Sequence, residues 1–164
     1  ANINYHDGKP GEVIEGNNYK VTLARLFHPN GCYAYRIEHE GKALVFSTDC
    51  EHYDDRPNKN LIELCQDADA LIYDAQYTED EYYGLNGEFS RKGWGHSTMQ
   101  EGVKVAKAAN VEKLILFHHD PTHDDNFIKK IETESRKLFP QSIAAYEGLQ
   151  IDLSQNELPK SLFD

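Results

Sequence analysis

Short apolar segments in this chain follow two kinds of spacing, and this difference limits the fold more than any other feature. The first three segments are joined by short turns, which predicts an antiparallel meander. The later segments alternate with helical patterns, which predicts a layered α/β arrangement whose strands are covered on at least one face. The last two strands are expected to pair across a tight turn at Glu147-Gly148. We expect the strands at Tyr19–Phe27, Tyr33–Glu38, Ala43–Phe46, Ala70–Tyr73, Lys113–Phe117, Ile143–Tyr146 and Leu149–Leu153.

Three helices are expected among these strands. A short helix is predicted at Asn60–Cys65. A longer helix at Ser97–Ala109 starts with Ser97-x-x-Gln100, which fits a capping box. Asp124 is expected to cap the third helix, in which apolar residues recur at helical spacing.

The chain is expected to form one domain, because 164 residues are enough for a single core. We place that domain at residues 19–164, after a turn-rich N-terminal segment at residues 1–18 that contains several Gly and Asn residues. Residues 77–95 are polar and aromatic without periodicity. Loops of that length usually serve a site or are disordered.

Charge and cysteine content narrow the function classes. A formal net charge of −11 argues against an extended nucleic-acid footprint, although bound divalent cations would still admit a small phosphate ester. No apolar run approaches the roughly 18 residues that span a membrane. The three cysteines Cys32, Cys50 and Cys65 form no CxxC pair, which predicts a protein of the reducing cytoplasm without a disulfide framework. Cys50 is expected in the core.

Polar side chains stand directly after four of the predicted strands, at His28, Asp49, Asp74 and His118. Ligands gather at the carboxyl ends of strands in α/β proteins. Taken singly, a His or Asp at such a position more often caps a turn or helix. Together they form a mixed nitrogen and oxygen set that suits zinc, manganese or iron.

An ordered series of motifs resembles a known family. The series is His-Pro-Asn-Gly-Cys-Tyr-Ala-Tyr-Arg-Ile from His28, Gly-Lys-Ala-Leu-Val-Phe-Ser-Thr-Asp ending at Asp49, Leu-Ile-Tyr-Asp-Ala-Gln-Tyr-Thr around Asp74, Gly-His-Ser-Thr around His96, and Leu-Ile-Leu-Phe-His-His-Asp-Pro around His118. This order is similar to the second half of metallo-β-lactamase-fold phosphodiesterases, especially the ribonuclease Z-like and cyclic-phosphodiesterase branches. The resemblance covers about residues 19–153 and implies the C-terminal half of a four-layer αββα fold.

The resemblance also implies a role for each of these residues. His28 would complete the ligands of a first metal, Asp49 would bridge two metals, and His118 would bind the second. His96 would stand near the leaving group, with Asp74 orienting it. Two divalent cations are expected, zinc first and manganese or iron as alternatives. A metal-bound hydroxide would then attack a small phosphodiester or a cyclic nucleotide.

One part of the family pattern is absent. The His-x-His-x-Asp-His signature that precedes these motifs does not occur here, and the chain has no H-x-H at all. Of seven usual ligands, three are matched, so an isolated chain would hold metal weakly or at one incomplete position. Three alternatives stay open for the missing half: a companion chain or second subunit supplies it, it has been removed, or it was lost in a degenerate homologue. A homodimer is a separate expectation.

Two other functions stay open on the sequence. The first is a non-catalytic half-domain that serves as a binding or regulatory module. The second is a receiver-like domain with Asp49 as phosphoacceptor, against which the early antiparallel strands count.

Two further groups of residues keep alternative interpretations. The cluster from His119 to Asp125 could form an entrance wall or an extra metal contact, or simply a turn and the Asp124 helix cap. Aromatic residues of segment 77–95 could stack on a base or pack the segment against the body. Asp80 and Glu81 in that segment would repel a polyanion, which favours a small substrate over tRNA. The aromatic residues in question are Tyr77, Tyr82, Tyr83, Phe89 and Trp94.

Overall fold

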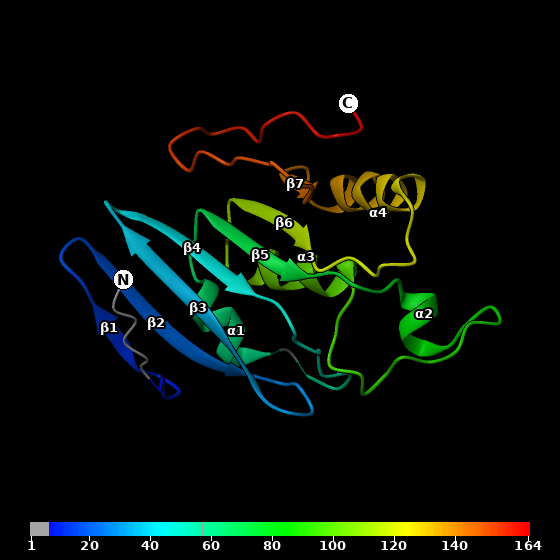
Figure 1. Cartoon of the computed structure of the whole chain (residues 1–164), viewed down its shortest axis with the longest axis horizontal. Helices are drawn as coiled ribbons and strands as arrows, with labels where there is room; N and C mark the ends of the chain where they lie inside the picture. The colour runs from blue at the N-terminus through cyan, green and yellow to red at the C-terminus, as the bar shows by residue number, and fades with distance from the viewer. Residues whose placement is uncertain (1–6, 57) are drawn as a thin grey trace, which may run out of the picture.

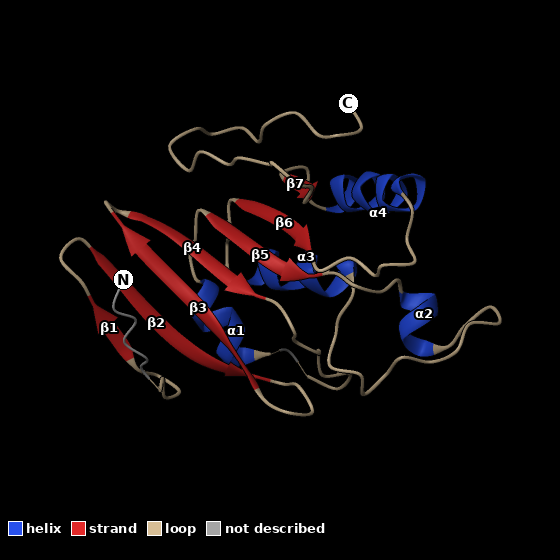
Figure 2. Cartoon of the chain, in the orientation of Figure 1, coloured by secondary structure: helices blue, strands red, loops and turns tan. Residues whose placement is uncertain are grey.

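A computed structural model describes residues 7–56 and 58–164 of the chain. Its described part contains one seven-stranded sheet with the order β1-β2-β3-β4-β5-β6-β7, together with four helices (Figures 1 and 2). The strands are β1 Val13–Glu15, β2 Tyr19–Leu26, β3 Cys32–His39, β4 Lys42–Ser47, β5 Ala70–Asp74, β6 Lys113–Phe117 and β7 Ser142–Ala144. The helices are α1 Lys59–Cys65, α2 Glu79–Tyr83, α3 Met99–Ala108 and α4 Asp125–Leu138.

The sheet changes from antiparallel to parallel at β4. Strands β1 to β4 pair antiparallel as a meander, and β4 to β7 pair parallel. Parallel neighbours need long crossovers, and α1, α3 and α4 lie in the three crossovers. The predicted antiparallel meander and the predicted α/β arrangement after it are therefore both confirmed. The carboxyl ends of β4, β5 and β6 meet at one edge of the sheet as a consequence.

The two faces of the sheet differ in what covers them. The main core packs one face of the sheet against α1, α3 and α4, with Val45, Leu71 and Leu116 fully buried. On the other face, residues 149–158 of the C-terminal segment lie against a smaller cluster of Ala70, Ile115 and Ile143. The C-terminal segment runs past β7 in Figure 1. None of the described helices is long and apolar enough to cross a membrane.

Part of that second face is uncovered. Tyr35, Ile37 and Phe117 are 40%, 38% and 39% exposed, and Phe46 contacts Phe117 with ring centroids 6.1 Å apart. Strand registers place these side chains on the same face of the sheet, since Tyr35 pairs with Phe46 and Phe46 pairs with Ile72. An apolar strip thus runs toward the edge where β4, β5 and β6 end.

Two sequence predictions about local structure are wrong. The expected capping box at Ser97 does not form, because the Ser97 hydroxyl is buried against Tyr73 and Thr98 caps α3 instead, accepting from the Glu101 N–H at 3.4 Å. Leu149–Leu153 is not a strand. The turn before it exists, with Leu149 N–H donating to Tyr146 O at 3.1 Å. The apolar side chains after that turn cover the sheet face rather than pairing, and β7 pairs parallel with β6.

Two short elements fall in segments predicted without regular structure. Strand β1 lies within the N-terminal segment 1–18, of which residues 1–6 fall outside the described residues. Helix α2 lies within 77–95. It starts with a capping box in which Thr78 and Glu81 each accept the other's backbone N–H. Gly84 ends it in the left-handed conformation at φ 70°.

Candidate metal centre

All five predicted site residues meet at the carboxyl edge of the parallel strands. Asp49 and His118 follow β4 and β6, and Asp74 ends β5. His28 follows β2, which runs in the same direction as β4, and His96 precedes α3. Ligand atoms of two sets, His28–Asp49–His96 and Asp74–His96–His118, lie within 4.8 Å of one another. The sequence-based grouping is therefore a spatial one.

Asp49 and His118 both adopt the left-handed backbone conformation, with φ of 54° and 61°. Such a conformation costs a non-glycine residue about 1–3 kcal/mol and persists only where the surroundings fix it. Asp49 is fixed by Thr48, whose hydroxyl donates to its carboxylate at 3.1 Å, and by the Cys32 thiol, which donates to its carbonyl at 2.6 Å. Strained residues of this kind cluster at functional sites.

Asp74 is the centre of the arrangement and is completely buried. His96 Nδ1 lies 3.0 Å and His118 Nδ1 lies 3.3 Å from its Oδ2. Burial alone would raise the pKa of the Asp74 carboxyl, but its contacts with the two imidazoles outweigh burial and lower that pKa. Backbone N–H groups also donate to the Asp74 carboxylate at 3.3 Å, from Cys50, Gln76 and Ser97.

His118 is oriented as a metal ligand would be. Its Nδ1 faces Asp74, and this contact raises the pKa of His118 against the effect of burial. Its Nε2 lies 4.0 Å from Asp49 Oδ1. A cation bound at about 2.0–2.2 Å from each atom would span that distance. Metal-binding imidazoles usually direct their other nitrogen at a carboxylate, as His118 does.

His96 and His28 fit a cation unequally. The Nδ1 of His96 is held by Asp74, so its Nε2 remains for a ligand, and its ring lies 4.8 Å from that of His118 and 6.0 Å from that of His28. The Nδ1 of His28 accepts the Asn30 N–H at 3.2 Å. That bond places the proton of a neutral ring on Nε2, so to bind a cation His28 would have to rotate or move that proton to Nδ1 and give up the Asn30 bond.

Glu51 is a functional candidate that the sequence did not indicate. It is 2% exposed and accepts from the Tyr82 hydroxyl at 2.7 Å and from the backbone N–H groups of Gly93 and Gly95 at 2.6 and 3.1 Å. A Cβ on Gly95 would lie 2.2 Å from the ring of His28. Glu51 thus fixes the backbone that supports both His28 and the adjoining His96. No sequence pattern marks a lone Glu for this role.

A second buried network lies behind His96. The Ser97 hydroxyl is 2.9 Å from both His52 Nδ1 and the Tyr73 hydroxyl. Burial lowers the pKa of His52 and raises that of Tyr73, so both groups favour their neutral forms. The network fixes the entry into α3, one residue after His96.

The cluster from His119 to Asp125 follows the simpler interpretation in part. Asp120 forms a turn, accepting the Thr122 N–H at 2.8 Å, and Asp124 caps α4 by accepting the Phe127 N–H at 2.8 Å. His123 Nε2 lies 2.8 Å from Glu81, which ties the α4 entry to α2. Cys50 is 1% exposed, as expected of a core residue.

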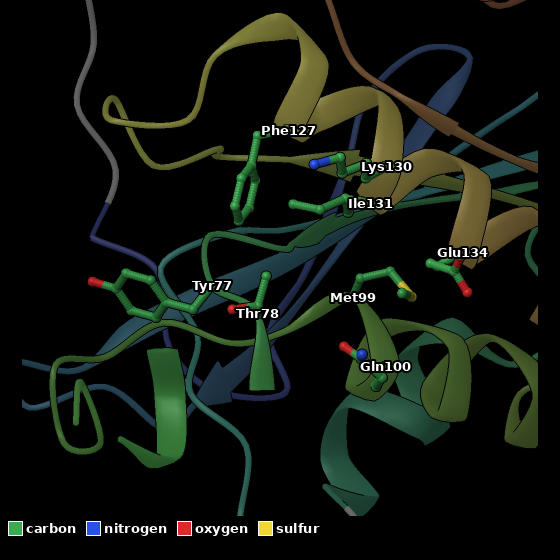
Figure 3. Close-up of a pocket in the computed structure, with 8 residues that line it drawn as sticks. All are labelled: Tyr77, Thr78, Met99, Gln100, Phe127, Lys130, Ile131 and Glu134. Carbon is green, nitrogen blue, oxygen red and sulfur yellow. The ribbon is translucent and has the colours of Figure 1, made fainter. Parts of the chain in front are cut away.

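A separate cavity of about 210 Å³ lies between α3, α4 and the segment after β5. Figure 3 shows Phe127 and Ile131 of α4 on one side of it and Met99 of α3 on the other, with Tyr77 at one end. The residues that line it include none of the five at the strand ends.

A family model described as a β-lactamase superfamily domain matches residues 2–119. The chain belongs to the β-lactamase superfamily. Ribonuclease Z of Lactobacillus helveticus is 32% identical to it over 143 residues, which are 87% of this chain and 42% of that relative. Ribonuclease Z of Listeria monocytogenes serovar 1/2a is 33% identical over 190 positions, which cover 88% of this chain and 60% of the relative. The chain therefore spans less than two thirds of the length of these relatives.

Solved structures share its fold. The metallo-β-lactamase fold protein YhfI from Bacillus subtilis has a TM-score of 0.63 at 20% identity, covering 84% of this chain and 50% of that one. Human short-form tRNase Z has a TM-score of 0.62 at 18% identity, covering 85% of this chain and 45% of that one. Zn²⁺-bound PqqB from Methylobacterium extorquens has a TM-score of 0.64 at 20% identity, covering 88% and 50%. The predicted metallo-β-lactamase fold is confirmed.

Proposed function

We propose that this superfamily domain forms part of a metal-dependent hydrolase that cleaves phosphodiester bonds. His28, Asp49 and His118 would hold one or two divalent cations, zinc first and manganese or iron as alternatives. The observation that carries the proposal is His118, whose Nδ1 lies 3.3 Å from the Asp74 carboxylate and whose Nε2 lies 4.0 Å from Asp49 Oδ1. When bound, the cations would supply a nucleophilic hydroxide near neutral pH and stabilise charge on the phosphate oxygens.

His96 and Asp74 would handle the proton of the leaving group. Asp74 holds His96 by its Nδ1 at 3.0 Å, so Nε2 points away from the carboxylate and can donate to a leaving oxygen. The ring contact of Tyr77, at 6.0 Å and 79° to His96, limits rotation of that imidazole.

We propose that further ligands come from protein that packs on the uncovered sheet face, either another part of the same protein or a companion subunit. Two observations support this. The relatives are longer than the chain, and the exposed Tyr35, Ile37 and Phe117 form an apolar strip that ends at the metal centre. Covering that strip would bring new side chains to the same edge.

A small phosphodiester or cyclic nucleotide is the substrate we favour over a folded RNA. The formal net charge of −11 opposes a long polyanion. The alignment to the Listeria monocytogenes ribonuclease Z extends over 190 positions, although it includes only 88% of this 164-residue chain. The ribonuclease therefore has insertions within the aligned region that this chain lacks. We also propose a reducing compartment, in keeping with three free thiols.

The test combines metal analysis with hydrolysis. Intact mass and elemental analysis of the purified chain would give its metal content, and bis(p-nitrophenyl) phosphate would report phosphodiesterase activity of the assembled protein. We expect His28→Ala and Asp49→Ala to abolish hydrolysis, while His39→Ala, on the far end of β3, leaves it unchanged. Full activity in both site variants would refute the proposed centre. If the purified chain holds no metal and the assembled protein does not hydrolyse the phosphodiester, the result would instead favour a non-catalytic binding module.

A further inference from the structure

Four of the five aromatic residues of segment 77–95 fall into two groups that the sequence could not separate. Tyr77 and Tyr82 are buried, at 3% and 1% exposure, and pack the segment against the body. Phe89 and Trp94 are 73% and 55% exposed, and their ring centroids lie 6.3 Å apart at an interplanar angle of 57°. The second group thus presents two neighbouring rings to solvent.

The backbone that carries Trp94 is held on both sides. The buried Glu51 carboxylate accepts from the N–H groups of Gly93 and Gly95, the two neighbours of Trp94 in the chain. The N–H of Trp94 itself donates to Arg91 O at 3.1 Å. A loop fixed in this way presents an exposed ring without losing further backbone entropy when a ligand binds.

This backbone also adjoins the metal centre. The Gly95 position leaves no room for a Cβ because the ring of His28 occupies that space, and His96 follows directly. Segment 77–95 extends beyond α2 and then returns to the carboxyl edge of the sheet (Figure 1). Trp94 therefore directly precedes Gly95, which packs against His28, and lies two residues before His96 in the chain.

The charges around the two rings are already paired. Arg91 lies 3.6 Å from Glu88, and Lys92 forms an ion pair with Asp54. These cations are engaged, which does not suit the capture of a polyphosphate. Exposed rings without free charge suit the flat face of a base, since every nucleobase stacks on an aromatic side chain.

We propose that Phe89 and Trp94 form a stacking platform for the nucleobase of the substrate, and that Glu51 is the positioning residue that holds it beside the metal centre. The inference deepens the proposed function, because it assigns a nucleotide as one half of the phosphodiester.

Trp94 is the single tryptophan of the chain, so its fluorescence reports on the platform without any need for catalysis. We expect adenosine 5′-monophosphate to quench the emission saturably, whereas ribose 5-phosphate, which lacks only the base, leaves it unchanged. Phe89→Ala should weaken the apparent affinity about 10-fold, in keeping with base–aromatic stacking. Tyr19→Ala, at a 51% exposed ring on β2, should have no effect.

Glu51→Gln tests the positioning role. It should weaken nucleotide quenching while Glu51→Asp restores part of it, with circular dichroism checking that both variants fold. Equal quenching by ribose 5-phosphate, or unchanged affinity in Phe89→Ala, would overturn the platform. Emission that changes with chain concentration but not with nucleotide would also overturn it and assign the rings to contact with a second copy. Nucleotide quenching by an assembled protein that does not hydrolyse bis(p-nitrophenyl) phosphate would keep the platform and reject the proposed enzyme.

Discussion

Replacing Asp74 with Asn removes the charge at the centre of the site while keeping the shape of the side chain. Asp74 contacts two imidazole nitrogens, at 3.0 Å on His96 and 3.3 Å on His118. The His96 hydrogen bond to this charged group contributes about 1.5–3 kcal/mol, and the His118 contact adds a charge attraction without hydrogen-bond geometry. Asn keeps an oxygen for the N–H groups of Gln76 and Ser97. Asp74→Asn should therefore lower the free energy of unfolding by about 3 kcal/mol.

The effect should depend on pH in a defined way. The lowered folded pKa of Asp74 means that its stabilisation is present above its ordinary value of 3.8 and is lost as pH falls through the folded value. The raised folded pKa of His118 means that its share is complete below its ordinary value of 6.5 and is lost as pH rises through the folded value. The difference between the two proteins should thus be largest near pH 6.

Urea denaturation of the metal-free chain between about pH 3 and 9 measures this difference, and NMR titration follows the imidazole of His118. We expect the pKa of His118 to fall in Asp74→Asn, because its carboxylate partner is lost. Asp55→Asn, at an exposed carboxylate, is the matched control and should change neither quantity appreciably. A loss of the same size at every pH, or an unchanged His118 titration, would refute Asp74 as the ionised centre of the site.

Three further changes test the surroundings of the site. Gly95→Ala should lower both the stability of the chain and its zinc affinity, because a Cβ there would lie 2.2 Å from the ring of His28. Gly93→Ala is the control, since a Cβ there meets nothing within 4 Å. Equal losses of zinc affinity in the two variants, measured by calorimetry, would contradict the clash with His28. Thr98→Ala should lower the urea-derived unfolding free energy by about 1 kcal/mol through loss of the α3 cap, and a change near zero would exclude that cap. Glu81→Gln should destabilise the chain near neutral pH but not in acid, since contacts with its imidazole and hydroxyl partners lower the pKa of Glu81 despite burial. A difference in melting temperature between Glu81→Gln and the unmodified chain that is independent of pH would argue against the charged contact of Glu81 with His123.

Strand positions were predictable because a strand needs an apolar run, and such runs are visible in the sequence. The predicted Lys113–Phe117 strand is found as β6 with the same bounds, and Ala70–Tyr73 differs from β5 by one residue. Helix α2 was missed although Thr78-x-x-Glu81 is a capping-box pattern, because five residues are too few to show helical periodicity. The α3 cap was misplaced because tertiary contacts with Tyr73 and His52 use the Ser97 hydroxyl.

The amino-acid sequence by itself determined the change from meander to crossover connections and the order of polar residues at the strand ends. Both follow from local patterns. The length of a connection decides whether the next strand pairs antiparallel or parallel, and the end of an apolar run marks the last residue of a strand. Only the tertiary structure decided that Asp74 contacts two imidazoles at once and that Glu51 fixes the backbone beside His28. It also decided that Tyr82 is buried while Trp94 is exposed. Burial and contact between distant residues arise from packing, and packing depends on all elements together.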